Sequence, residues 1–197
     1  MASATWASWV VLGVVVLLGI AIYNKLTRLR NAVANAFAQI DVQLKRRYDL
    51  IPNLVETARK YLQHERETLE AVIQARNQAQ TAAGKARADL AGAGNVAALG
   101  AAEAALGGAL GKLMLVVESY PQLKADQNMR EFAEALTSTE NRIGFARQAY
   151  NDSVLSFNDA AMQFPASVVA RWWGFAAAAT LQSTQSAAER SAPTVRF

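Results

Sequence analysis

Few residues in this chain have the types and spacing that catalysis or metal binding requires. The 197 residues include no cysteine and one histidine, His64, which lies between Gln63 and Glu65. Zinc sites use about four Cys, His or carboxylate ligands, nucleophilic catalysis needs an activating base, and a di-iron site in a bundle needs two Glu-x-x-His pairs. One histidine beside acids meets none of these needs, so we interpret His64 as a surface or structural residue. The composition predicts no metal, no other cofactor and no enzymatic activity.

A set of polar residues is spaced to form a layer between packed helices. These side chains cluster in two distant regions of the chain and would fall one or two turns apart on their helices. Such layers commonly fix the register of a bundle, and a ligand or lipid-headgroup site is the alternative. The expected members are Arg46, Arg47, Asp49 and Asn53 from the first region, and Glu140, Asn141, Arg142, Arg147, Tyr150 and Asn151 from the second.

The densest aromatic stretch lies at residues 164–175, with two tryptophans, two phenylalanines and Arg171. Adjacent Trp172 and Trp173 would point about 100° apart on a helix, so one face of a bundle cannot easily bury both. Amphipathic rings beside an arginine are typical of interfacial anchors. We therefore expect Trp172, Trp173 and Phe175 to contact the bilayer or a neighbouring subunit. Capping of the bundle end is the alternative.

The first 24 residues are uncharged and strongly apolar. As a helix, residues 2–23 would measure about 33 Å, enough to cross a hydrocarbon core. No basic residue precedes the apolar run, which argues against a cleaved signal peptide. The sequence predicts one transmembrane anchor.

Basic residues follow the anchor directly. Residues 25–47 carry six basic side chains and one acid, whereas the remaining chain is close to neutral. By the positive-inside rule, Lys25, Arg28 and Arg30 predict an amino terminus outside and a cytoplasmic carboxyl side, and they would attract anionic lipid. A nucleic-acid partner is not expected, because the basic excess is confined to this juxtamembrane stretch.

Helical periodicity organises the rest of the chain, and no strand pattern is present. Apolar residues recur every three or four positions from the anchor to about residue 47, on to about residue 79, and again over 96–120 and 129–164. The predicted fold is all-α: the transmembrane helix continues into an up-and-down antiparallel bundle of four-helix type. The expected divisions are the anchor 1–24, the bundle 25–163, an aromatic amphipathic segment 164–181 and a tail 182–197.

Three local features of the sequence bear on how the helices are connected. Pro52 is either a kink in a continuous helix or the first turn of a new one, and we favour a kink or a tight break over a long loop. A turn would bring the aromatic segment back to the membrane, whereas a kink would place it at the distal end and favour subunit contact. The Ala/Gly-rich residues 80–95 predict a surface connection with Asn95 capping the next helix, and Asp126 is predicted to cap the last.

The last five residues alternate apolar and polar side chains. We expect Val195 and Phe197 to dock in a groove, either on the same bundle or a neighbouring copy, or on a carboxylate-binding domain of a partner.

Several stretches together resemble the LemA family of bacterial membrane proteins. The resemblance covers nearly the whole chain, although the Gly/Ala-rich residues 90–111 and Arg196 depart from the family pattern. It implies a long-helix antiparallel bundle on one amino-terminal anchor and implies no enzymatic activity. The stretches are YNKL at 23–26, QLKRRYDLIPNLV at 43–55, ESYPQLKADQN at 118–128, ENRI at 140–143, ARQAYN at 146–151 and VRF at 195–197.

Together these features predict a single-pass protein of the bacterial inner membrane that forms homo-oligomers and acts as a scaffold or membrane organiser. The alternative is an adaptor that presents clients to a membrane-protein partner such as a membrane enzyme.

Overall fold

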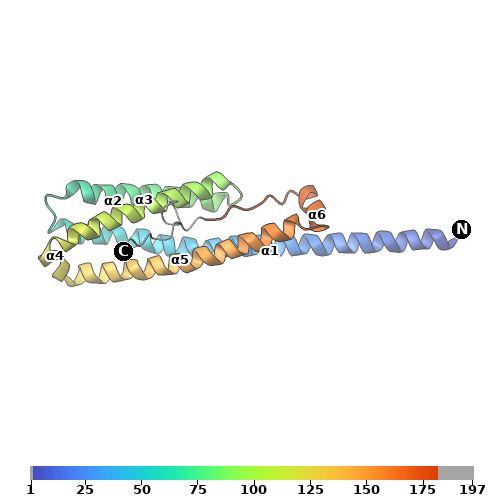
Figure 1. Cartoon of the computed structure of the whole chain (residues 1–197), viewed down its shortest axis with the longest axis horizontal. Helices are drawn as coiled ribbons and strands as arrows, with labels where there is room; N and C mark the ends of the chain where they lie inside the picture. The colour runs from blue at the N-terminus through green and yellow to red at the C-terminus, as the bar shows by residue number, and fades with distance from the viewer. Residues whose placement is uncertain (1, 182–197) are drawn as a thin grey trace, which may run out of the picture.

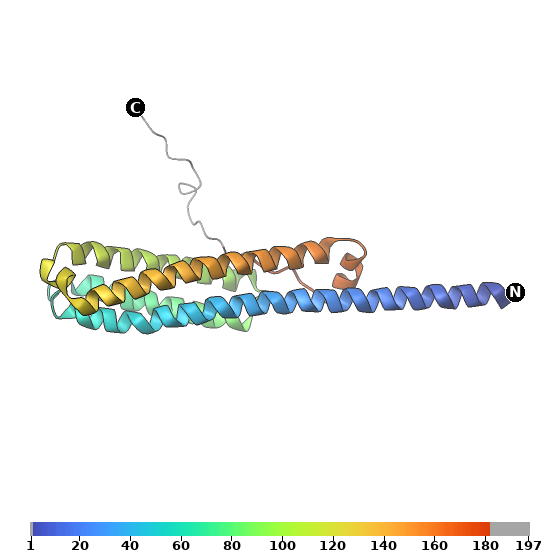
Figure 2. The same cartoon turned by 90° about the horizontal axis from the view of Figure 1, so that it is seen from below.

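The computed structural model of the chain describes residues 2–181, in which all regular structure is helical. Four long helices form an antiparallel bundle, and one of them extends far beyond it at the amino-terminal end (Figures 1 and 2). The predicted all-α, up-and-down bundle on a long amino-terminal helix is confirmed. The helices are α1 (Ala2–Arg59), α2 (Arg66–Ala88), α3 (Ala93–Glu118), α4 (Pro121–Ala125), α5 (Gln127–Met162) and α6 (Ala166–Trp172).

Helix α1 runs without interruption for 58 residues, with Pro52 inside it. Proline has no amide hydrogen, so the carbonyl oxygen of Tyr48, four residues earlier, loses its usual helical donor. Arg76 of α2 replaces that donor, because its Nε lies 3.1 Å from the Tyr48 oxygen. The helix therefore continues through Pro52, and the alternative that Pro52 begins a new helix is wrong.

The first chain reversal lies at residues 60–65 and includes His64. The periodicity that predicted a helix to about residue 79 did not reveal it, because Leu62 within the turn is as buried as a core residue. Tyr61 and Tyr120 hold this end of the bundle, with hydroxyl groups that donate to Asp126 at 3.0 Å and to Glu65 at 3.4 Å.

This reversal brings α5 back to the end of the bundle from which the apolar part of α1 emerges (Figure 1). Helix α6 lies at that same end, beside α1. The expectation that a continuous helix at Pro52 would place the aromatic segment at the distal end is therefore wrong. That expectation allowed a reversal only at Pro52, whereas the chain reverses about ten residues later, at 60–65.

The predicted surface connection at residues 80–95 is also wrong in extent. Helix α2 continues to Ala88, and the connection covers only residues 89–92. Small side chains at 79, 82, 83 and 86 are buried and let α2 pack closely on α3. Gly92, not Asn95, precedes the first turn of α3, and its amide donates to Asp89 at 3.0 Å.

Helix α5 packs along α1 over much of its length, and this is the most extensive contact between two helices in the bundle. The predicted cap is present: the Asp126 carboxylate accepts from the Met129 amide at 3.0 Å. The same hydrogen bond lowers the pKa of Asp126, with a smaller contribution from the Tyr61 hydroxyl. By contrast, α3 and α5 have almost no close backbone contact, so the bundle has an open seam between them.

After α6 the chain reverses at Gly174, whose φ of 69° lies in the left-handed region that glycine adopts without strain. The Phe175 amide donates to the Ala170 carbonyl at 2.9 Å, which completes the helix terminus. We call residues 175–181 the return segment. It lies against α5, where Asn158 and Asn151 each exchange two hydrogen bonds with its backbone, at Ala178 and Leu181 respectively.

Candidate functional site

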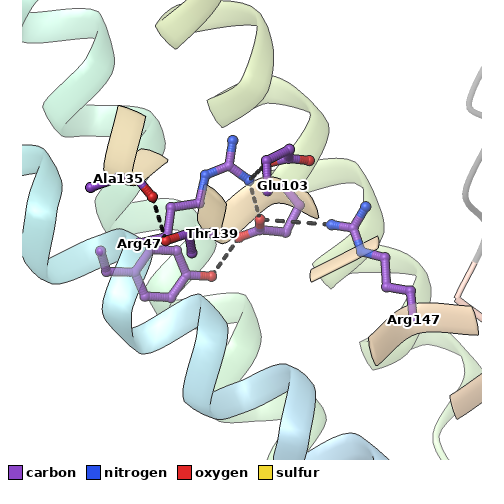
Figure 3. A network of polar contacts seen from close by, with 7 residues as sticks. Arg47, Glu103, Ala135, Thr139 and Arg147 are labelled. Atoms are coloured by element: carbon purple, nitrogen blue, oxygen red, sulfur yellow. Dashed lines mark hydrogen bonds and ion pairs between the residues drawn. The ribbon is translucent and has the colours of Figure 1, made fainter. Parts of the chain in front are cut away.

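A buried carboxylate, Glu103 of α3, is the centre of the polar cluster inside the bundle. Arg47 of α1 donates to it at 3.0 Å, the Tyr48 hydroxyl donates to it at 2.5 Å, and Arg147 of α5 lies 3.8 Å away. Figure 3 shows Arg47 and Arg147 approaching Glu103 from two different helices. Glu140 completes the cluster with an ion pair to Arg47 at 2.8 Å. The cluster thus joins α1, α3 and α5 at one level.

The structure brings together only part of the predicted polar layer. Arg47, Glu140 and Arg147 meet in the cluster, while the Tyr150 hydroxyl donates instead to the Ala179 carbonyl of the return segment. Asn141 is exposed but lines the pocket beside the cluster. The other members lie exposed on the outer faces of α1 and α5, so their inclusion in the layer is wrong: Arg46, Asp49, Asn53 and Arg142.

Glu103 was missing from the predicted layer, although the sequence contains a signal for it. It lies four residues after Leu99 and three before Leu106, on the same helical face as these core residues. An acid on an apolar stripe requires a buried partner, because an unpaired charge is very costly to bury. Two arginines supply that partner.

The electrostatics of the cluster favour a structural role. Burial, followed by repulsion from the Glu103 carboxylate and the hydrogen bond to it, raises the pKa of Tyr48 far above its usual value, so the hydroxyl remains a donor. A pocket of about 420 Å³ lies along the seam between α3 and α5. Its charged lining residues Arg47, Glu103, Glu140 and Arg147 are paired with one another. A paired, buried polar layer of this kind is suited to setting the register of the helices that it joins.

A second site is the aromatic end of the bundle. Five apolar side chains on and beside α6 are largely exposed, and we call them the interface patch. Phe164 is 84% exposed, Trp172 82% and Trp173 56%. The remaining members are Met162 and Val168.

Phe175, predicted to be a membrane or subunit contact, is buried, so that expectation is wrong for this residue. Its ring packs on Tyr23 at 5.6 Å and on Phe157 at 6.4 Å between centroids, because Gly174 turns the chain back into the bundle. Phe175 therefore packs between the bundle and the interface patch rather than belonging to the exposed patch itself. The Arg30 guanidinium lies 5.2 Å from its ring centroid, a cation–π contact.

The predicted basic group Lys25, Arg28 and Arg30 is exposed on α1, directly after the apolar span. Within the described residues, two helices are long and apolar enough to cross a membrane, α1 and α3. The apolar part of α1 lies outside the bundle and is hardly covered by protein. Helix α3 instead packs on α2 and carries buried Glu103 in an ion pair, so we assign it to the bundle.

Two expectations concern other parts of the chain. Val195 and Phe197, predicted to dock in a groove, lie outside the described residues. Among residues 2–181, no group of three or more His, Asp or Glu side chains is placed to hold a metal ion.

Part of the chain is similar to magnetosome proteins. It is 33% identical over 78 residues to the magnetosome protein MamQ of Magnetospirillum gryphiswaldense, covering 40% of this chain and 29% of that protein. It is 34% identical over 82 residues to magnetosome protein MamQ 2 of Paramagnetospirillum magneticum, covering 42% of this chain and 30% of the relative. The chain thus matches less than a third of the length of these relatives.

The family comparison covers far more of the molecule. The LemA family model matches residues 36–197, a range that includes the polar cluster, the long α5 and the aromatic end. The resemblance seen in the sequence motifs is therefore confirmed, and the protein belongs to the LemA family.

Proposed function

We propose that this protein is a single-pass scaffold of the bacterial inner membrane, without enzymatic activity, whose bundle stands in the cytoplasm and self-associates. The continuity of α1 carries the proposal. One helix includes both the exposed apolar span and the buried core residues Phe37, Leu44 and Leu54, with no break between them. Because the bundle and the anchor share one continuous helix, the bundle would be held at a fixed distance from the bilayer. A fixed distance is what a structural scaffold requires.

The polar cluster supports the non-enzymatic part of the proposal. Arg47 and Arg147 together offset the charges of Glu103 and Glu140. A catalytic site requires a group with a free proton or lone pair aimed at a substrate. The cluster satisfies its charges internally instead.

Exposed apolar side chains on the bundle support self-association. Leu115 of α3 is 68% exposed, and it follows a face of alanine and glycine along the same helix. Small residues on a helix face permit close approach of another helix, and an exposed apolar surface gains free energy when it is covered.

The mass of the full chain in lipid nanodiscs tests the scaffold. We expect a defined homo-oligomer, and we expect Leu115→Glu to reduce its mass. Gln63→Glu, which adds the same charge in the exposed distal turn, should leave the mass unchanged. A monomer that co-purifies with a different membrane protein would instead support the adaptor.

Topology is tested separately by reporters fused after Phe197. A fluorescent protein that folds only in the cytoplasm should be bright, and alkaline phosphatase at the same position should be inactive. The opposite pair of results would place the bundle outside.

A further inference from the structure

We propose that the interface patch rests in the polar–apolar boundary of the bilayer that α1 crosses, so that the bundle has a second membrane contact beside its anchor. The inference rests on the proposed anchoring by α1. It goes further by assigning a lipid-binding surface to α6, with anionic phospholipid as its partner.

The depth of the patch follows from its contacts with α1. Tyr23 is the last residue of the apolar span before Asn24 and Lys25. Its ring lies 5.9 Å from that of Trp173 and 5.6 Å from that of Phe175, between centroids. A residue that ends the span lies near the level of the headgroups, so the patch beside it lies at that level too.

The patch is held at this level by the bundle itself. Phe175 is buried against Phe157 of α5. Asn158 of α5 also makes two hydrogen bonds at 2.9 Å with the backbone of Ala178 in the return segment. Helix α6 also packs on both α1 and α5. Because α1 continues from the span into the bundle, the patch cannot move away from the membrane surface unless α6 detaches.

The chemistry of the patch fits lipid. Its exposed tryptophans are amphipathic rings of the kind enriched at membrane boundaries, and Met162 and Phe164 add purely apolar surface. Basic side chains occur on the same elements, since Arg171 precedes Trp172 in the chain, and Lys25 and Arg28 lie exposed on α1 within about two turns of Tyr23. Basic side chains beside apolar rings complement anionic headgroups above acyl chains.

Continuity with the span favours lipid over a second copy of the chain. A bilayer that surrounds the apolar part of α1 up to Tyr23 already lies beside Trp173. Lipid can cover the patch without any oligomer, whereas a neighbouring bundle would have to exclude lipid from a surface at headgroup depth.

Depth-dependent fluorescence quenching tests the proposal on the full chain. Trp6 and Trp9 are changed to Phe, so that only Trp172 and Trp173 emit, and the protein is placed in vesicles of phosphatidylcholine and phosphatidylglycerol. We expect a blue-shifted emission that loses most intensity with lipids brominated near the headgroup and less with lipids brominated near the chain end. Iodide in the water should quench it weakly.

The matched control moves the emitter along α5. In a background with all four tryptophans changed to Phe, Phe145→Trp places one indole at a site that is 74% exposed and about 25 Å from the end of α5 near α6. Brominated lipid should not quench it. Resistance of each variant to carbonate extraction reports insertion of α1 independently.

The outcomes separate the possibilities. Emission from Trp172 and Trp173 that iodide quenches and brominated lipid does not would place the patch in water and overturn the proposal. Emission protected from both quenchers would assign the patch to a subunit contact and overturn it equally. Either result in protein that resists extraction would leave the anchor intact, so failure of the patch and failure of the anchoring are distinguishable.

Discussion

Replacing Glu103 with glutamine tests whether the buried cluster holds the bundle together. The change removes one charge and little volume from a side chain that faces Arg47 at 3.0 Å, where the two side chains are 2% and 6% exposed. Removing one partner of a buried pair typically costs about 3–5 kcal/mol, because the other charge is left uncompensated. Here Glu140 still pairs with Arg47 at 2.8 Å. We therefore expect Glu103→Gln to lower the free energy of unfolding by about 2–3 kcal/mol, at or just below the lower end of that range.

Glu140→Gln is the matched control, since it removes the same charge from the same arginine. Its side chain is 52% exposed, so water screens the pair and can replace the lost contact. Exposed pairs contribute about 0–1 kcal/mol, and we expect a loss within that range.

The assay is thermal and urea unfolding of the full chain in detergent, followed by circular dichroism at a helical band. Glu103→Gln should reduce the midpoint clearly more than Glu140→Gln, with unchanged helix content before the transition. Equal losses in the two variants would mean that burial does not decide the strength of these pairs. An unaffected Glu103→Gln would refute the structural role of the cluster.

Arg76→Met should lower the free energy of unfolding by about 1–3 kcal/mol, because it leaves the Tyr48 carbonyl without a donor. Pro52→Ala should largely suppress that loss, because an alanine amide supplies the missing hydrogen bond. A double-mutant cycle in urea unfolding measures this coupling. Asn151→Ala removes both hydrogen bonds that hold the end of the return segment, and we expect proteolysis to cleave that segment faster at unchanged overall helicity, which mass spectrometry of timed digests will show. The cap bond lowers the pKa of Asp126 in the folded state, so its stabilising effect is present above the unfolded pKa and is lost as the pH falls below about 4; Asp126→Asn should flatten this part of the pH–stability curve.

Periodicity predicted the long α5 and its cap correctly, because a core face and a capping carboxylate are both local signals. The reversal at residues 60–65 escaped it, since Leu62 keeps the apolar pattern unbroken through the turn. The boundary between α2 and α3 was misplaced for a different reason. Alanine and glycine are typical both of loops and of closely packed helices, and only the contact between α2 and α3 distinguishes the two.

The sequence predicted some members of the polar cluster but not its central carboxylate, Glu103. Arg47, Glu140 and Arg147 were expected to meet, but which charges pair depends on the relative rotation of three helices, which a single sequence does not specify. The orientation of Phe175 likewise depends on one backbone reversal at Gly174.

The unbroken α1 has a mechanical consequence. From Tyr23 to Arg59 the helix measures about 54 Å, so each 10° of tilt at the bilayer displaces its far end by about 9 Å. Transmembrane helices adjust to thinner bilayers by tilting. In this protein α1 continues as one helix through Pro52, where Arg76 supplies a donor for the Tyr48 carbonyl. In the anchored arrangement that we propose, the long helix would act as a lever arm, so that a small change in bilayer thickness would produce a large displacement of its far end.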